Sequence, residues 1–417
     1  MTVTLSSSLT LPCGATLSNR IVKAAMSEGM ADVHGHATPR LEALYRRWGK
    51  SGAGLLLSGN IQVDRDHLER PLNIVLDGTE GLPALRRMVE AGRADGAHFW
   101  AQISHTGRQV SSHINSAPLS CSDVEIDVIR DAGFSFAAPR AMSEAEIADA
   151  VGRFAHTARL AQQAGFTGVE VHGAHGYLIS QFLSPLSNTR TDHWGGSLAN
   201  RARFLLVVIA AIRAAVGPKF PIGLKLNASD FQKGAFTAAE CREVVGWLNN
   251  TSLDLLELSG GSLEQPKVVG VALKDEGEDG RRTSTIQREA YFIEFAAGIT
   301  AVAKMPVMVT GGFRTLSGMT GALADAELDL VGIGRPMIAD PGIPTKLLAG
   351  AIERTPTPEA NIGLLQILPW FNMQLEAIAA GKEPDPALDG DAATAAFIEI
   401  EGSNMARLLQ QRASEAA

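Results

Sequence analysis

The chain has 417 residues, of which 45% are hydrophobic and 20% are charged, so it can bury a large core as one barrel-sized domain with an extension or as two domains. Its formal net charge is −8, and no basic block along the chain could follow a phosphate backbone, which argues against nucleic acid as a partner. No apolar run is long enough to cross a membrane, and no charged region precedes an apolar run near the first residues. We therefore expect a cytoplasmic protein without a membrane partner.

Short apolar runs rich in β-branched residues recur along the chain. They occupy residues 21–26, 54–60, 98–104, 168–173, 221–227, 255–260, 306–312 and 330–335. Most intervals between these runs have helical periodicity and a start signal, such as Thr38 before Pro39, Ser143 with Glu146, or Thr237 with Glu240. Eight strand–helix units with crossovers too long for hairpins predict an α/β fold, namely a parallel (β/α)8 TIM barrel over residues 1–345. A doubly wound open sheet is the alternative, although no Gly-x-Gly-x-x-Gly follows the first strand.

Two segments fall outside this repeat. The interval between the third and fourth strands is too long for a simple crossover, and its polar first half predicts a loop over the mouth of the barrel. Residues 346–417 alternate Pro-rich stretches with helical ones, which predicts a C-terminal helical extension packed on the barrel or forming a subunit contact. Trp370 and Phe371 in this extension suggest the subunit contact, and hence a homo-oligomer.

Polar residues gather where the predicted strands end. In TIM barrels the chemistry lies at the carboxyl ends of the strands. His172, His175 and Tyr177 follow one such end, and they could be metal ligands, hydrogen-bond donors or rim residues. Their convergence favours a functional role. A metal site is disfavoured because no carboxylate or third histidine stands at a neighbouring strand end, and the three cysteines are far apart in sequence.

The last two strands end in glycines and a basic residue. Gly312, Gly334 and Arg335 are suited to a phosphate pocket, because glycines let backbone N–H groups approach an anion and the guanidinium adds charge. Turn glycines beside a solvated arginine are the alternative interpretation. Lys225, on the fifth strand, leaves open an aldolase-type barrel that forms a Schiff base with its substrate.

The segment HGAHGYLISQFLSPLSNTRTDHWGGSLANRARF (172–204) resembles the signature region of the Old Yellow Enzyme family of flavin oxidoreductases. Further matching segments follow the family's order, among them SNRIVKAAMSE, AQISHTGRQ and GIGRPMIADP. The resemblance implies a TIM barrel with FMN bound across the strand ends and reduced by NADPH or NADH. Neither the cysteines nor the length of the related iron–sulfur branch is present, so a single flavin is implied.

The resemblance also assigns residues to the cofactor. Ser27 stands where the family has a threonine or cysteine near the flavin C4 carbonyl, and Gln102 corresponds to the residue at the pyrimidine edge. Lys225 replaces an arginine whose charge faces that edge, so the charge is kept but bidentate hydrogen bonding is lost. The complete set implied to bind FMN is Ala24, Ala25, Met26, Ser27, Gly59, Gln102, His172, Lys225, Gly312, Gly334 and Arg335.

The implied reaction is that of an ene-reductase. A hydride passes from the nicotinamide through flavin N5 to the activated C=C bond of an α,β-unsaturated carbonyl or nitro compound. His172 and His175 correspond to donors that stabilise charge on the substrate oxygen, and Tyr177 corresponds to the proton donor. The segment 260–292 is expected at the substrate mouth. A non-catalytic flavin-binding protein is a further alternative, disfavoured because FMN binding requires neither His175 nor Tyr177.

Overall fold

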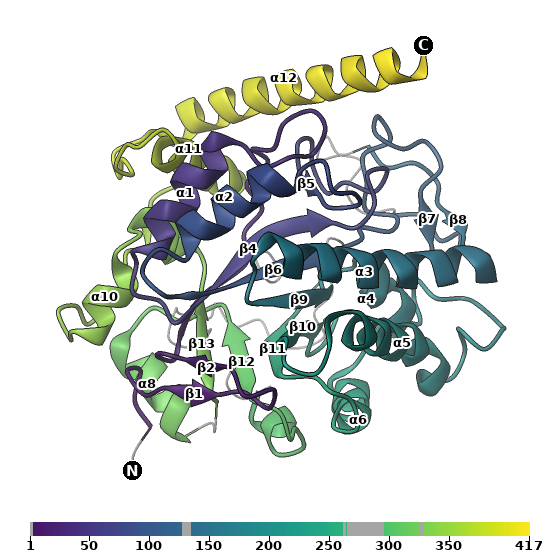
Figure 1. The fold of residues 1–417 in the computed structure, drawn as a ribbon, viewed down its shortest axis with the longest axis horizontal. Helices are drawn as coiled ribbons and strands as arrows, with labels where there is room; N and C mark the ends of the chain where they lie inside the picture. The colour runs from purple at the N-terminus through teal and green to yellow at the C-terminus, as the bar shows by residue number, and fades with distance from the viewer. Residues whose placement is uncertain (1–2, 127–134, 262–263, 265–295, 326–327) are drawn as a thin grey trace.

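Eight parallel strands close into a barrel in the computed structural model, which describes residues 3–126, 135–261, 264, 296–325 and 328–417 (Figure 1). Each predicted run overlaps one barrel strand. The strands are β3 (Ile21–Lys23), β4 (Leu55–Gln62), β6 (His98–Ser104), β9 (Gly168–Gly173), β10 (Ile222–Asn227), β11 (Leu255–Ser259), β12 (Val307–Thr310) and β13 (Leu330–Ile333). Pairing of β3 with both β13 and β4 closes the sheet, so the TIM barrel is confirmed and the open doubly wound sheet is wrong.

Helices cover the outside of the barrel. They are α1 (Pro39–Gly49), α2 (Leu82–Gly92), α3 (Glu144–Ala164), α4 (Leu178–Leu183), α5 (Leu198–Val216), α6 (Ala238–Leu248), α8 (Leu316–Asp325), α9 (Arg335–Ala339) and α10 (Ile343–Leu348). The predicted start signals are confirmed. Thr38 accepts a hydrogen bond from the N–H of Leu41, and Ser143 and Thr237 each form a capping box with the glutamate three residues on.

The interior of the barrel changes from apolar to polar along the strands. At the amino-terminal end, a hairpin of β1 (Leu9–Thr10) and β2 (Thr16–Leu17) covers an apolar floor. The floor consists of Leu9, Leu11, Leu17, Val22, Leu55, Leu57, Trp100, Leu255, Met308 and Leu330. Two residues further along β11 the inward position is Glu257, and Gln102, Glu170 and Lys225 are buried near it. These polar groups therefore lie between the apolar floor and the mouth of the barrel.

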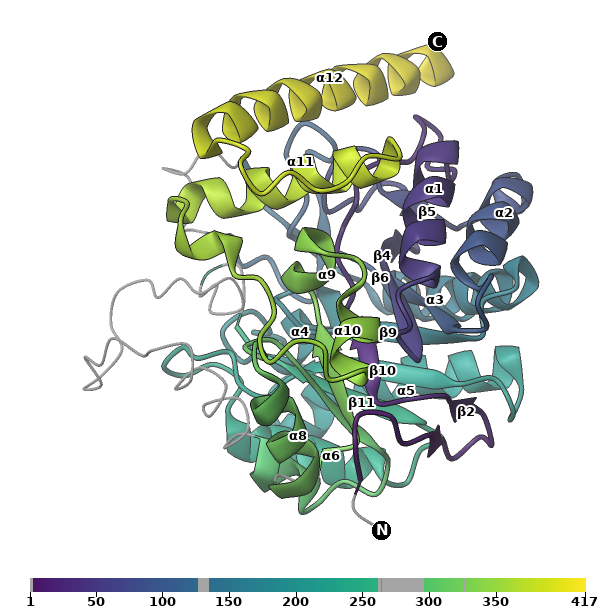
Figure 2. The ribbon, with the colours of Figure 1, turned by 90° about the vertical axis from the view of Figure 1, so that its left-hand side faces the viewer.

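The C-terminal segment forms two long helices on one side of the barrel. Figures 1 and 2 show α12 (Gly390–Ala416) lying across α11 (Ile367–Ala379). Trp370 and Phe371 are 2% and 4% exposed, and the indole N–H of Trp370 donates to the carbonyl of Leu388. Both rings are therefore buried within the chain and pack the extension itself, while a subunit contact of this extension stays a prediction. Short 3-10 turns at Pro358–Ala360 and Leu364–Gln366 precede α11.

Two expected mouth segments are described only in part. The interval after β6 carries β7 (Leu119–Ser120) and β8 (Arg140–Ala141), which pair in parallel, while residues 127–134 lie outside the described residues. Most of the segment 260–292 also lies outside them, so its placement stays a prediction. A short strand, β5 (Ile74–Val75), pairs in parallel with the last two residues of β4. Within the described ranges, no helix has the length and apolar character needed to span a bilayer.

Candidate active site

The turn after β9 brings His172, His175 and Tyr177 together. The ring centroids of His172 and His175 are 5.0 Å apart, and those of His172 and Tyr177 are 4.7 Å apart. His175 has a φ of +59°, a left-handed conformation that is uncommon for a residue with a Cβ atom. Asn227 accepts its N–H at 3.2 Å and Gln109 donates to its carbonyl at 2.9 Å. These two amides hold the strained turn in place.

Both histidines are neutral. Burial is the main cause that lowers the pKa of His172 well below its usual value, with the nearby charge of Lys225 acting in the same direction. Burial and Lys225 likewise lower the pKa of His175 to about 3. The Nδ1 atom of His172 accepts the N–H of Ala174 at 3.3 Å, so its hydrogen is on Nε2. Each ring can therefore donate one hydrogen bond without carrying a charge.

Tyr177 keeps its proton. Burial and the charge of Glu69 raise the pKa of its phenol well above the ordinary value, while hydrogen bonding by Asn60 acts against the rise. Asn60 also donates to Glu69 at 3.5 Å. Sequence reasoning did not single out Asn60 or Glu69. The position of Asn60 at the end of an apolar strand run was the signal that could have found it.

A buried polar network lies inside the barrel beside His172. Lys225 stands opposite His172 on one neighbouring strand and opposite Glu257 on the other, and its Nζ atom lies 2.9 Å from Glu257 Oε1. Burial opposes the charge of Lys225, but Glu257 and Glu170 outweigh burial and raise its pKa. Gln102 donates to Glu170 at 2.6 Å. The sequence located Gln102 and Lys225 but not the two glutamates as site residues.

The ends of β12 and β13 carry the predicted phosphate residues. Gly311 and Gly312 have φ values of +107° and +87°, which glycine adopts without strain. A Cβ atom added at Gly334 would meet only the sulfur of Met26, at 3.7 Å, so the backbone there is open to approach. Arg335 lies 3.6 Å from the carboxylate of Glu359, and Arg314 binds the same carboxylate at 2.6 Å. Arg314 is a second guanidinium that sequence reasoning missed.

The loop after β3 completes this rim. Ala25, Met26 and Ser27 are partly exposed, whereas Ala24 is buried and donates its N–H to the carbonyl of Ile333. At Gly59 a Cβ atom would lie 2.1 Å from a carboxylate oxygen of Glu28 and 2.5 Å from the carbonyl of Met26. Only glycine at this position allows β4 to approach the loop so closely.

The residues at the mouth fit FMN. A phosphomonoester needs backbone N–H groups and positive charge, which the glycines after β12 and β13 and the two arginines can supply. The pyrimidine edge of an isoalloxazine carries both donors and acceptors, and the amide of Gln102 can serve either kind. In the order of strands around the barrel, the loop after β3 that carries the partly exposed Ala25 and Met26 lies between β13 and β6. Each assignment of a residue to the cofactor remains a proposal.

A cluster of Asp64, His67 and His105 has the composition of a metal site. Its ligand atoms lie within 4.8 Å of one another. However, Leu119 donates its N–H to Nε2 of His67, and Gly107 donates to Nδ1 of His105. The other nitrogen of each neutral ring must then carry hydrogen, and both of these nitrogens face Asp64. Both nitrogens of each imidazole are thus engaged in hydrogen bonds or face Asp64, so neither ring offers a free lone pair to a metal.

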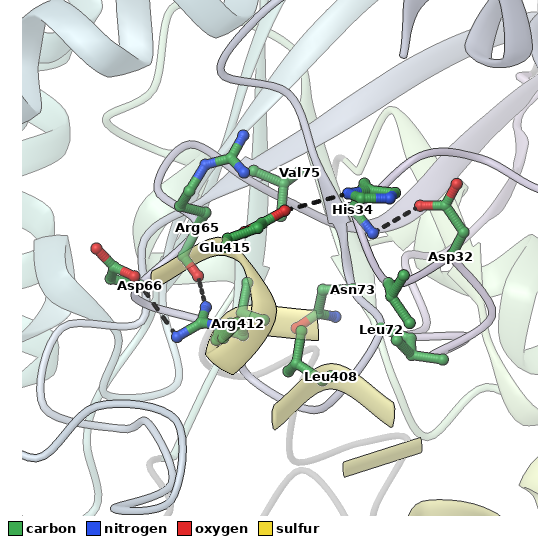
Figure 3. A pocket seen from close by; sticks show the side chains of 13 residues that line it. Asp32, His34, Arg65, Asp66, Leu72, Asn73, Val75, Leu408, Arg412 and Glu415 are labelled. Atoms are coloured by element: carbon green, nitrogen blue, oxygen red, sulfur yellow. Dashed lines mark hydrogen bonds and ion pairs between the residues drawn. The ribbon is translucent and has the colours of Figure 1, made fainter. Parts of the chain in front are cut away.

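A hollow of about 340 Å³ lies elsewhere, against the end of α12 (Figure 3). Its charged groups are paired with one another. His34 lies 3.5 Å from Glu415, and Arg412 lies 3.5 Å from Asp66. None of the predicted site residues lines it, so it offers no alternative location for the chemistry.

Comparisons with known proteins identify the family and the fold. Residues 11–353 match the NADH:flavin oxidoreductase / NADH oxidase family. The NADH-dependent flavin oxidoreductase nadA of Aspergillus parasiticus is 35% identical over 376 residues, covering 87% of this chain and 80% of that protein. A 2-naphthoyl-CoA reductase structure has a TM-score of 0.77 at 25% identity, covering 94% of this chain and 57% of that chain. Morphinone reductase has a TM-score of 0.70 at 24% identity over 87% of this chain and 94% of its own, which supports the fold.

Proposed function

The chain belongs to the NADH:flavin oxidoreductase / NADH oxidase family, which includes the Old Yellow Enzymes, and we propose that it reduces the activated C=C bond of α,β-unsaturated carbonyl or nitro compounds. The family makes the chain an FMN-dependent oxidoreductase with a nicotinamide as reductant. NADH is the proposed reductant because the relative nadA is named NADH-dependent. The observation that carries the proposed substrate class is the grouping of two neutral imidazoles and a protonated phenol at one strand end.

FMN, when bound, supplies reversible hydride chemistry between the nicotinamide and the alkene. We assign its phosphate to Gly312, Gly334 and Arg335, with Arg314 adding charge nearby. Gln102 and Lys225 lie at the opposite, pyrimidine side, and the backbone of residues 24–27 and Gly59 lies between. In this proposal residues 1–345 hold the cofactor, and residues 346–417 steady the loop after β3 from outside.

His172 and His175 hold the oxygen of the substrate. Addition of a hydride at the β-carbon places negative charge on the carbonyl or nitro oxygen. Two fixed donors that are already desolvated stabilise this charge without reorganisation. Neutral imidazoles are suited to the task, because they donate a hydrogen bond without repelling Lys225. The burial that lowers both pKa values therefore keeps the two imidazoles in the neutral form that this role requires.

Tyr177 supplies the proton at the α-carbon. A general acid must still hold its proton at working pH, and burial together with Glu69 keeps the phenol protonated. Asn60 hydrogen-bonds the phenol and restricts its direction. The same contact stabilises the phenolate that remains after transfer, because hydrogen bonding to the charged form lowers its pKa.

The Schiff-base alternative is disfavoured by the state of Lys225. A nucleophilic lysine needs a depressed pKa, but Glu257 and Glu170 outweigh burial and raise the pKa of Lys225. Its amine stays protonated and is bound by a carboxylate. The alternative of a flavin-binding protein without turnover does not account for the second histidine and the tyrosine, which cofactor binding does not need.

A labelling experiment tests the substrate class. The purified holoenzyme is incubated with NADH and 2-cyclohexen-1-one in D2O, and the product is analysed by mass spectrometry and NMR. The proposal predicts cyclohexanone with solvent deuterium at the α-carbon and a hydrogen from NADH at the β-carbon. Consumption of NADH with oxygen but no conversion of the enone, or of a nitroalkene tested in parallel, would contradict it.

A further inference from the structure

Inside the barrel, two glutamates and one lysine lie in contact without access to water. Glu170 and Glu257 are fully buried, and Lys225 is 4% exposed. Lys225 binds Glu257 through the 2.9 Å contact, and the carboxyl groups of Glu170 and Glu257 are hydrogen-bonding neighbours. Among the other titratable groups near them, His172 and His175 are neutral, and the buried Lys23, which senses the charge of Lys225, interacts with Glu28 as its own counter-charge. Two carboxylates and one ammonium would leave a negative charge buried without compensation.

A shared proton removes this charge. Two carboxylates in contact cannot both ionise in a dry site, so one of them keeps a proton. Glu257 is the ionised member because it holds Lys225, and Glu170 is the protonated one. The pKa directions agree: burial and Glu257 raise the pKa of Glu170 well above its usual value. For Glu257, burial acts upwards and is the largest cause, but the charge of Lys225 together with hydrogen bonds from Glu170, Thr310 and Lys225 outweighs it, and the pKa falls.

The proton also satisfies an orphaned atom. With both groups ionised, Glu170 Oε1 is buried and has no hydrogen-bond partner among the described residues. A proton on Oε1 lets it donate to Glu257. Oε2 is then the carbonyl oxygen of the acid, and it accepts the amide N–H of Gln102 at 2.6 Å.

The orientation of Gln102 follows from this contact. Its amide nitrogen is engaged by Glu170, and its backbone N–H donates to the hydroxyl of Ser58 at 2.9 Å. No hydrogen bond between described residues reaches its side-chain oxygen. An amide whose nitrogen is fixed on one side presents its oxygen on the other, so Gln102 offers an acceptor to a ligand N–H.

We propose that Glu170 acts as a neutral carboxylic acid, hydrogen-bonded to Glu257, and positions Gln102 so that its amide oxygen accepts an N–H from the pyrimidine edge of bound FMN. Glu170 touches neither cofactor nor substrate and is a positioning residue. The inference rests on FMN binding by the family and not on the proposed alkene substrates.

Two substitutions test whether Glu170 works as a neutral acid that both accepts and donates a hydrogen bond. Glu170→Gln keeps both functions, since its amide oxygen can accept from Gln102 while its NH2 group donates to Glu257. Glu170→Leu keeps the volume but removes both. The exposed Glu90→Gln on α2 is the matched control. The holoenzymes are compared by the rate at which FMN dissociates on dilution and by the infrared C=O band of a protonated carboxylic acid.

We expect FMN retention in Glu170→Gln within about twofold of the parent protein and about tenfold weaker retention in Glu170→Leu, the loss of roughly one hydrogen bond. The acid band should be present in the parent and in Glu90→Gln, and absent from Glu170→Gln. Equal weakening in Gln and Leu variants that remain folded, or a parent protein lacking the band, would overturn the inference. If these results hold while enones are not reduced, the inference survives and only the proposed substrate class fails.

Discussion

The Nε2 atom of His175 lies 2.8 Å from the Oγ atom of Ser259 at the carboxyl end of β11. A neutral imidazole carries hydrogen on one nitrogen only, so the role of this hydroxyl decides which nitrogen can donate to a ligand. When Ser259 donates to Nε2, the hydrogen of His175 remains on Nδ1 and is available to a substrate oxygen. We propose that Ser259 donates in this pair and thereby favours the tautomer in which His175 can donate to a ligand through Nδ1.

Ser259→Ala tests this control. Without the hydroxyl, the hydrogen can occupy either nitrogen, and we predict that kcat/KM for 2-cyclohexen-1-one falls about tenfold, the value of roughly one hydrogen bond. Ser259→Thr, which keeps the hydroxyl, should retain most of the activity. Steady-state kinetics with saturating NADH provide the comparison. Parent-like kcat/KM in the alanine variant would show that Ser259 has no such role.

Tyr177→Phe tests the proton donor. General acid catalysis contributes about 10²- to 10⁴-fold, so enone reduction should slow by a factor in that range. Reduction of the enzyme by NADH needs no proton from Tyr177 and should change far less. Anaerobic stopped-flow mixing measures the two half-reactions separately. Equal loss in both half-reactions would indicate damage to cofactor placement instead.

Asn60→Ala provides a companion to that variant. Asn60 hydrogen-bonds the phenol of Tyr177 and thereby opposes the rise in its pKa. Its removal should raise that pKa further and slow protonation, and we expect about a tenfold lower rate of enone reduction, from the loss of roughly one hydrogen bond. Because the phenol itself remains, the effect should be smaller than that of Tyr177→Phe. A larger effect would contradict the assignment of Tyr177 as the acid.

Acid should destabilise the fold from about pH 6.5 downwards. The pKa values of His105 and His175 are lowered to about 4 and about 3, chiefly by burial, whereas the unfolded chain takes up these protons near pH 6.5. The unfolded state then binds more protons, so the free energy of unfolding falls as the pH falls from 6.5 towards these values. The expected loss is about 1 kcal/mol per pH unit per histidine. Urea unfolding at several pH values measures it, and His175→Asn should show a shallower slope.

Arg70 connects the C-terminal helices to the loop that carries Ser27. It binds Glu401 of α12 at 2.7 Å and Asn372 of α11 at 2.7 Å, and it also reaches the carbonyl of Ser27. Arg70→Ala should lower the free energy of unfolding by at least about 2 kcal/mol, since the charged hydrogen bonds of a mostly buried guanidinium are lost.

The exposed pair of Arg47 and Glu383 offers a matched control for that variant. Arg47→Ala should change stability by less than about 1 kcal/mol, because solvent screens a surface ion pair. Urea unfolding compares the two variants. If the free energy of unfolding falls equally in both variants, the contacts of Arg70 with α11 and α12 stabilise the fold no more than a surface ion pair does.

Much of the barrel could be predicted from the sequence. Each of the eight apolar runs overlaps a strand. Buried parallel strands need continuous apolar residues, and such a run can be recognised in the sequence without knowledge of distant contacts. The run at 21–26 was predicted too long. β3 ends at Lys23, since the residues that follow leave the sheet to form the rim of the mouth.

The site was predictable where a side chain follows a strand, as for His172, His175 and Tyr177. Glu170 and Glu257 were harder to interpret because each sits within a strand, where the sequence does not show that a lysine on the strand between them makes the pair tolerable. The burial of Trp370 likewise depends on how α11 meets the barrel. Such tertiary packing has no local signal in the sequence.

An anaerobic spectral cycle tests the central claim most directly. NADH is added to the purified holoenzyme until the visible flavin absorption is bleached, and 2-cyclohexen-1-one is then added in the same cuvette. The account predicts that the absorption returns in proportion to the enone added and that cyclohexanone forms in equal amount. A spectrum that stays bleached with enones and nitroalkenes, yet recovers when oxygen is admitted, would contradict it.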